Sequence, residues 1–206
     1  MIPGGQFEAL RGVRIIINKR SIISNTPPEF PKIEPHNVQI PSGQSFKEWI
    51  ESRTARYETR TVDWNALKFQ ADFDPKYKRA QMRYIGTGGS GVTSDPNVVP
   101  ADHFTFSTMV LPAGCEGPLH IHYDAEEVFF ILKGKKIRLF FEQAGEEVDT
   151  VLTERDVISV PPGVYRGLRN EGVEEALMCV MIGNPKPVIP TYPESHPISK
   201  IKRPEN

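Results

Sequence analysis

The sequence predicts an all-β fold in its second half, an antiparallel sandwich or barrel that spans residues 99–184. From Asp102 onward apolar and polar residues alternate, as in HFTFSTMVL, which is the pattern of strands with one buried face. Short turn segments separate these stretches, and no segment able to form a crossover helix lies between them. Both features are typical of an antiparallel sandwich or barrel. Eight strands are expected, at residues 103–111, 118–123, 127–132, 136–142, 148–153, 157–160, 165–170 and 176–182.

The two flanks differ from this region in composition, because most of the 19 prolines fall in them. Residues 1–98 are expected to form an N-terminal arm with one or two helices. Residues 185–206 are expected to form an extended tail, anchored through Ile189 and Tyr192. Long proline-rich arms are suited to exchange between subunits, so we expect a homodimer.

The clearest helix of the arm is expected at residues 45–57. Ser45 and Glu48 have the spacing of a capping box, in which each side chain accepts a hydrogen bond from the other residue's backbone. Phe46 and Ile50 follow at helical spacing on one face. We expect this apolar face to pack on the barrel.

A glycine-rich segment matches the dinucleotide-binding fingerprint at Gly86, Gly88 and Gly91. The fingerprint binds a pyrophosphate only when its last glycine opens a helix. Pro96 and Pro100 follow here, so such a helix cannot form, and the sequence predicts a flexible linker instead.

The overall composition excludes some classes of partner. Twenty-five basic and 26 acidic residues give a net charge of −1, which creates no field for nucleic acid or anionic membrane. The N-terminus has no apolar segment of signal-peptide length, and the longest apolar run is too short for a bilayer. Two widely separated cysteines are expected to be reduced thiols. We therefore expect a cytoplasmic protein.

Two histidines and a carboxylate form a candidate metal site. Residues i and i+2 of a strand point to the same face, so His120 and His122 would project side by side. Glu126 and Glu127 follow directly, ahead of an apolar strand. Two imidazoles and one carboxylate suit a divalent first-row metal ion with open coordination positions. The alternative is a pair of surface histidines beside an acidic turn.

This stretch resembles the first sequence motif of the cupin superfamily, G-x5-H-x-H-x(3,4)-E-x6-G. Here the motif is Gly114, His120, His122, Glu127 and Gly134, and all five positions match. The resemblance selects Glu127 over Glu126 as the carboxylate ligand. It implies a double-stranded β-helix, the jelly-roll barrel of a single-domain cupin, with a metal ion held by two histidines and a glutamate.

The second cupin motif, G-x5-P-x-G-x2-H-x3-N, is altered in this chain. Pro161, Gly163 and Asn170 match, but Arg155 stands at the first glycine and Arg166 at the histidine that is often the fourth ligand. An arginine stays protonated and offers only donors, so it cannot replace that ligand. His103 is a less favoured substitute.

Strand parity from the preceding turn directs Arg166 into the barrel, where a guanidinium needs an anion. Three interpretations stay open. Arg166 pairs with Glu126 or Glu127 in place of a metal; it binds a carboxylate or phenolate of the substrate beside the metal; or it bends outward into solvent.

The resemblance implies a function less directly than a fold, because one fold hosts many activities. The first hypothesis is a metal-dependent dioxygenase acting on a small acidic or aromatic metabolite, with Fe favoured and Mn, Ni or Zn as alternatives. Arg166 would be its catalytic anion-binding residue. The other hypotheses are a non-catalytic or metal-free cupin that binds a small anionic ligand, and a metal-independent isomerase.

Overall fold

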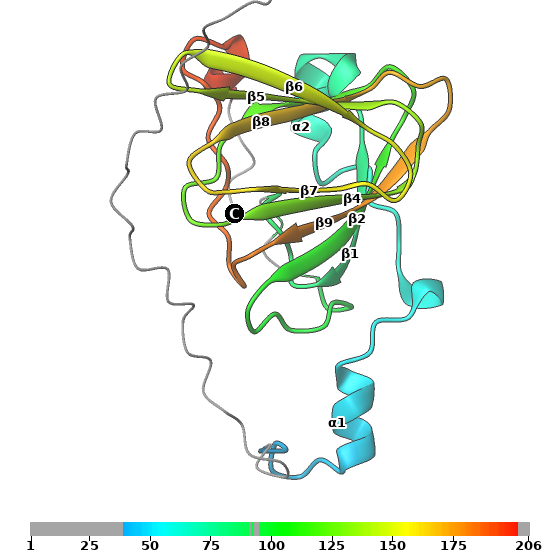
Figure 1. Ribbon diagram of the computed structural model, residues 1–206. Helices are drawn as coiled ribbons and strands as arrows, with labels where there is room; N and C mark the ends of the chain where they lie inside the picture. Colours follow the sequence, from blue (N-terminus) through cyan, green and yellow to red (C-terminus); the bar gives the residue numbers. More distant parts are fainter. Residues whose placement is uncertain (1–38, 91, 93–94, 202–206) are drawn as a thin grey trace, which may run out of the picture. The chain divides into compact units, whose positions relative to one another are not determined.

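Two antiparallel sheets form the fold, as the sequence predicts. The computed structural model describes residues 39–90, 92 and 95–201. Figure 1 shows the sheets as two facing layers. The larger sheet contains, in spatial order, β1 (Ala80–Ile85), β2 (Thr105–Leu111), β9 (Ala176–Ile182), β4 (Glu127–Lys133) and β7 (Val157–Val160). The smaller sheet contains β3 (Glu116–His120), β8 (Tyr165–Asn170), β5 (Ile137–Gln143) and β6 (Glu146–Leu152).

The strands β2 to β9 correspond one to one with the eight expected strands and differ from them by a few residues at their ends. The additional strand is β1, which lies before residue 99 and pairs with β2 along its whole length. Its Ala80 and Met82 are buried in alternation with partly exposed residues. The larger sheet therefore includes a strand from the segment that precedes the expected barrel.

The core lies between the two sheets and follows from the alternation of apolar residues. In both β2 and β9 every second residue is buried. The central side chains come from both layers and include Leu111, Phe129, Ile131, Ile137, Leu139 and Met178. Burying one such side chain contributes roughly 1.5–3 kcal/mol relative to leaving it in water. Cys115 and Cys179 are free and only partly buried, as expected for reduced thiols.

Positive backbone φ angles explain two positions of the sequence motifs. Gly134 has a φ of 145°, and a Cβ there would lie 3.2 Å from Ala176 Cβ. Arg155 stands where the second cupin motif has glycine, and its φ of 72° is in the left-handed region that favours glycine. The chain thus keeps the backbone conformation of the motif even where it lacks the residue.

The helix α1 (Phe46–Ser52) has the expected capping box, since Ser45 and Glu48 exchange both hydrogen bonds. The expected packing of its apolar face is wrong. No residue of α1 is buried, and Phe46 is 63% exposed. The helix contacts the barrel through the ion pair between Arg53 and Asp102. The expected homodimer stays a prediction, and the proline-rich arm within residues 1–38 lies outside the described residues.

The segment before β1 and the C-terminal tail pack against each other. The segment before β1 contains η1 (Tyr57–Thr59), α2 (Lys68–Phe73) and η2 (Pro75–Tyr77). The described part of the tail ends shortly after η3 (Pro197–Lys200). Tyr77, Tyr192 and Ile198 form a small second core. The Gln70 amide donates a hydrogen bond of 2.5 Å to the Tyr192 hydroxyl. The tail is thus anchored through Tyr192, whereas Ile189 is half-buried.

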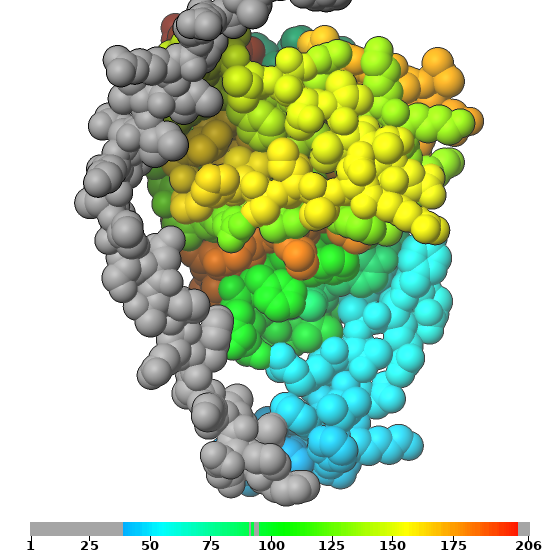
Figure 2. Space-filling model, viewed as in Figure 1, coloured from blue at the N-terminus to red at the C-terminus, as the bar shows by residue number. Residues whose placement is uncertain are grey.

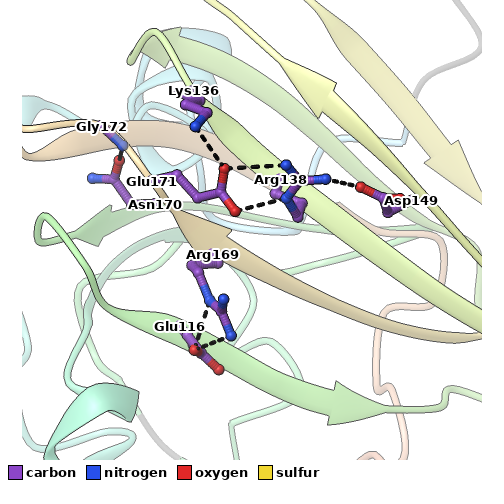
Figure 3. A network of polar contacts seen from close by, with 8 residues as sticks. All are labelled: Glu116, Lys136, Arg138, Asp149, Arg169, Asn170, Glu171 and Gly172. Atoms are coloured by element: carbon purple, nitrogen blue, oxygen red, sulfur yellow. Dashed lines mark hydrogen bonds and ion pairs between the residues drawn. The ribbon is translucent and has the colours of Figure 1, made fainter.

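The solvent-facing side of the smaller sheet carries a network of ion pairs (Figure 3). Arg169 of β8 bonds to Glu116 of β3 at 2.7 Å. Arg138 of β5 bonds to Asp149 of β6 and to Glu171, which also pairs with Lys136. The side chains of β6 are mostly exposed and contribute to the surface drawn in yellow and yellow-green in Figure 2. No helix in the described part of the chain is long and apolar enough to cross a membrane.

Candidate metal centre

The structure brings His120, His122 and Glu127 together as the sequence predicts. His120 ends β3, His122 follows two residues later, and Glu127 begins β4. The Nε2 atoms of the two histidines lie 3.5 and 3.7 Å from Glu127 Oε2. One potential ligand atom from each residue lies within 4.8 Å of the other two, a grouping that could hold a metal ion. His122 and Glu127 are buried, and the His120 side chain is 12% exposed.

Both histidines can offer a lone pair to a metal ion. His120 Nδ1 lies 2.8 Å from the carbonyl oxygen of Pro118, which only accepts, so Nδ1 carries the proton. A hydrogen bond from the other ring nitrogen to a carbonyl is the usual support of a metal-bound histidine. Burial lowers the pKa of His122 to about 4, so its imidazole is neutral at neutral pH.

Glu127 is the anionic member of the group. Burial by itself raises the pKa of this carboxyl, but the neighbouring side chains of His120, His122 and Arg166 outweigh this effect. The pKa therefore lies below its usual range. Glu127 Oε2 and His122 Nδ1 are buried without a hydrogen-bond partner in the described residues. An acceptor oxygen left unsatisfied between two imidazoles fits a bound cation, so the donor set suits a divalent ion.

Arg166 points into the barrel, and the interpretation that it bends outward into solvent is wrong. Its side chain is fully buried, and it lies directly across from His120 in the pairing of β3 with β8. Its Nε lies 3.6 Å from Glu127 Oε2, and its Nη2 donates to the carbonyls of Val160 and Pro161. Burial lowers the pKa of Arg166 and the charge of Glu127 opposes this effect. These contacts favour the pairing with Glu127.

The triad faces a cavity of about 70 Å³. His120, His122 and Glu127 line it from the barrel, together with apolar side chains such as Phe129 and Met109. Arg166 does not line it. Other parts of the wall come from the flanks, among them Gln70 of α2, Arg79 before β1 and Tyr192 of the tail. Arg79 is buried, with 8% of its surface exposed, and the sequence reasoning did not single it out.

Comparison with known proteins agrees with this architecture. A family model described as a cupin domain matches residues 107–183. Residues 107–183 form a cupin domain. No curated protein matches the sequence of this chain.

Solved structures resemble this chain at low sequence identity. Peruvianin-I, a cysteine peptidase from Thevetia peruviana latex, is 13% identical with a TM-score of 0.50, over 72% of this chain and 80% of that one. A recombinant oxalate oxidase in complex with glycolate is 18% identical, with a TM-score of 0.44 over 55% and 54% of the two chains. The cupin domain of Schizosaccharomyces pombe Cnp3 is 20% identical, with a TM-score of 0.39 over 52% and 64%. This chain spans about half the length of that oxalate oxidase.

The glycine-rich segment before the cupin domain is part of the site rather than a flexible linker. Gly88, Gly89 and Ser90 line the cavity, and Ser90 is buried. A Cβ added at Gly89 would lie 3.2 Å from His122 Cε1, so the missing side chain lets the backbone approach the imidazole. Among the described residues no helix lies between this segment and β2, and Pro96 and Pro100 stand where the dinucleotide-binding geometry needs one.

His103 does not join the ligand group. It is exposed, and it is absent from the metal-binding cluster found among the described residues. The cupin domain therefore offers three side-chain ligands, with Arg166 in the neighbourhood where many relatives have a fourth.

Proposed function

We propose that this cupin binds a divalent first-row metal ion through His120, His122 and Glu127 and is an iron-type oxygenase acting on a small acidic metabolite. The observation that carries the proposal is the buried triad facing a cavity, with one potential ligand atom from each residue within 4.8 Å of the other two. Three protein ligands leave coordination positions open, which is the arrangement of the 2-His-1-carboxylate oxygenases. When bound, the ion supplies Lewis-acid and one-electron chemistry at those positions.

The chain's own residues prepare the site for this ion. The Pro118 carbonyl fixes the tautomer of His120, and burial keeps His122 neutral. Arg166 helps to hold Glu127 in its ionised form through an ion pair with Oε2, the oxygen that also faces the two histidines. Arg166 is therefore proposed as a positioning residue that acts through Glu127, in place of the direct substrate contact expected from the sequence. Apolar side chains of the barrel, such as Phe129 and Leu168, line the cavity beside the triad.

The size of the cavity selects among the acidic and aromatic substrates expected from the sequence. Its volume of about 70 Å³ is less than half of the roughly 150 Å³ in which an engineered protein cavity holds benzene. A small aliphatic acid is favoured over an aromatic one on this basis.

One observation favours a second candidate, a metal-free cupin that binds a small ligand. The ion pair with Arg166 gives the buried Glu127 a compensating charge even without a metal ion. A metal-independent isomerase has less support, because the low pKa of His122 makes it a poor proton carrier near neutral pH.

The test is elemental analysis of the purified protein, with His122→Ala and His103→Ala as paired variants. We expect near-stoichiometric iron, manganese, nickel or zinc in the wild type and in His103→Ala, whose histidine is exposed, and loss of the metal in His122→Ala. Oxygen uptake with small carboxylic acids then tests turnover. A wild type without metal, and without uptake after reconstitution, overturns the metal proposal. Turnover that persists after chelation and without oxygen identifies an isomerase.

A further inference from the structure

Arg79 is a buried cation on the wall of the cavity, and no carboxylate of the described residues forms an ion pair with it, although the charge of Glu127 acts on it from further away. Its Nη1 donates to the carbonyl of Tyr77 at 3.1 Å. Two other buried or largely buried arginines have carboxylate partners: Arg83 pairs with Asp63 and Asp95, and Arg166 lies beside Glu127. Within the part of the chain that the structure describes, no carboxylate lies within ion-pair distance of Arg79.

A buried charge without an ion-pair partner is costly, so its presence needs a reason. Burial lowers the pKa of Arg79 to about 10, which still leaves the guanidinium protonated at neutral pH. The guanidinium has five donors in a planar fork and lines the cavity, an arrangement that suits a planar anion. With a divalent ion at the triad, positive charge in the cavity region would exceed the single negative charge of Glu127.

Polar atoms without partners lie on the same wall. Gln70 Oε1, Gln81 Oε1 and Ser90 Oγ are buried, belong to residues that line the cavity, and have no hydrogen-bond partner in the described residues. The two amide oxygens can accept from a hydroxyl group of a ligand, and the Ser90 hydroxyl can donate to an oxo group or accept from a hydroxyl. The wall therefore offers a cation for a carboxylate and neutral groups for a second oxygen.

We propose that Arg79 is the carboxylate-binding residue of the cavity, and that the ligand is a short aliphatic carboxylate with an adjacent hydroxyl or oxo group. The guanidinium binds the carboxylate through two parallel hydrogen bonds, and the second oxygen faces the triad. A cavity of about 70 Å³ is smaller than the roughly 150 Å³ cavity that holds benzene, which favours a ligand of a few carbon atoms. The inference rests on the proposed function only for the part of the ligand that meets the metal.

The test measures binding of glycolate and acetate by calorimetry and thermal shift, with acetamide as the uncharged probe of similar size. Wild type, Arg79→Met, Arg79→Lys and Arg53→Met are compared, each metal-loaded and chelated. Arg53 is the control because its ion pair with Asp102 is exposed and outside the cavity. We expect carboxylates, but not acetamide, to stabilise the wild type and Arg53→Met. Arg79→Met should lose at least about tenfold in affinity, because a hydrogen-bonded charge contact is removed.

The outcomes separate this inference from the proposed function. Unchanged carboxylate binding by Arg79→Met with normal metal content overturns the role of Arg79 and leaves the metal site standing. A wild type that takes up no metal overturns the proposed function, and the chelated arm still decides the role of Arg79. If Arg79→Met does not fold, Arg79→Lys gives the answer. Lysine keeps the positive charge but lacks the two parallel donors of the guanidinium. An affinity for carboxylates equal to that of the wild type would overturn the bidentate contact.

Discussion

The two sides of the cavity are built in different ways. On the barrel side, His120 lies in β3 and Glu127 in β4, strands of the two facing sheets, and the register of β3 with β8 places Arg166 opposite His120. On the flank side, Arg79 and Tyr192 come from connecting segments outside the cupin domain, residues 107–183. Strand pairing fixes the first group, whereas packing between distant segments fixes the second. Many proteins divide these roles in the same way: a rigid scaffold supports the site, and connecting segments select the ligand.

The same difference is visible in the two buried arginines. Arg166 is fully buried and faces the carboxylate of Glu127, so its charge has a partner within the folded chain. Arg79 is almost as deeply buried and lines the cavity, with no carboxylate of the described residues at ion-pair distance and only the more distant charge of Glu127 acting on it. An arginine that balances a buried charge stabilises the fold. A buried arginine whose anionic partner is a ligand destabilises the ligand-free protein, and binding of the ligand offsets this loss. Substitution of the two should therefore change stability in opposite directions.

The largest effect is expected for Arg166→Met, measured by chemical denaturation with a chelator present. Removing the guanidinium leaves Glu127 buried with only the histidines beside it, and breaking a buried pair in this way costs about 3 kcal/mol of the free energy of unfolding. The double variant Arg166→Met/Glu127→Gln serves as the control, because it removes the charge that was left alone. It should recover much of the loss, and an Arg166→Met protein as stable as the wild type would show that the pair does not couple.

Arg79→Met should have the opposite sign and a smaller size. An apolar side chain of similar length replaces a buried charge that has no carboxylate partner, so we expect the ligand-free protein to gain about 1 kcal/mol. The measurement is the same denaturation, with and without saturating glycolate. Glycolate should stabilise the wild type but not the variant. The difference in free energy of unfolding between the two proteins should therefore become smaller or change sign when glycolate is present. A clear loss of stability in the ligand-free variant contradicts a ligand-binding role and indicates a structural arginine.

The barrel side could be predicted from the sequence because its signals are local. Period-two alternation located β2 to β9, and the i, i+2 spacing of His120 and His122 placed both imidazoles on one side. The turn at Gly163 fixed the parity that directs Arg166 inward. The sequence could not predict which anion Arg166 contacts, because this choice depends on how far the cavity extends along the strand.

The flank side could not be predicted, because its structure depends on contacts between distant residues. Arg79 lies in the basic stretch PKYKRA, which resembles a solvated surface, yet Tyr77 and Arg79 are buried and Lys78 between them is exposed. That alternation was present in the sequence as a weak signal. The wall itself forms when Gln70 bonds to Tyr192, across 122 positions of the chain. For α1 the sequence predicted a buried apolar face, and the structure leaves that face exposed. Helical periodicity identifies an apolar face but does not reveal what covers it.

The exposed ion network of Figure 3 gives the smallest expected effect and a reference for the buried pair. Hydrogen bonds from Arg138 and then Lys136 lower the pKa of Glu171 from 4.5 to about 2. A carboxyl whose pKa is lower in the folded state adds stability above its unfolded pKa and loses it as pH falls through the folded value. The melting temperature of Glu171→Gln should therefore be slightly below that of the wild type at neutral pH, and this deficit should shrink from pH 4.5 towards pH 2.

Salt separates this network from the pair inside the barrel. Ions screen charges at the surface within a few ångströms at about 1 M salt, but they do not reach a side chain that is fully buried. Concentrated NaCl at neutral pH should reduce the deficit of Glu171→Gln and leave that of Arg166→Met nearly unchanged. If both deficits shrink equally, the Arg166–Glu127 pair is open to solvent, and the barrel side of the cavity is no more shielded than the sheet surface.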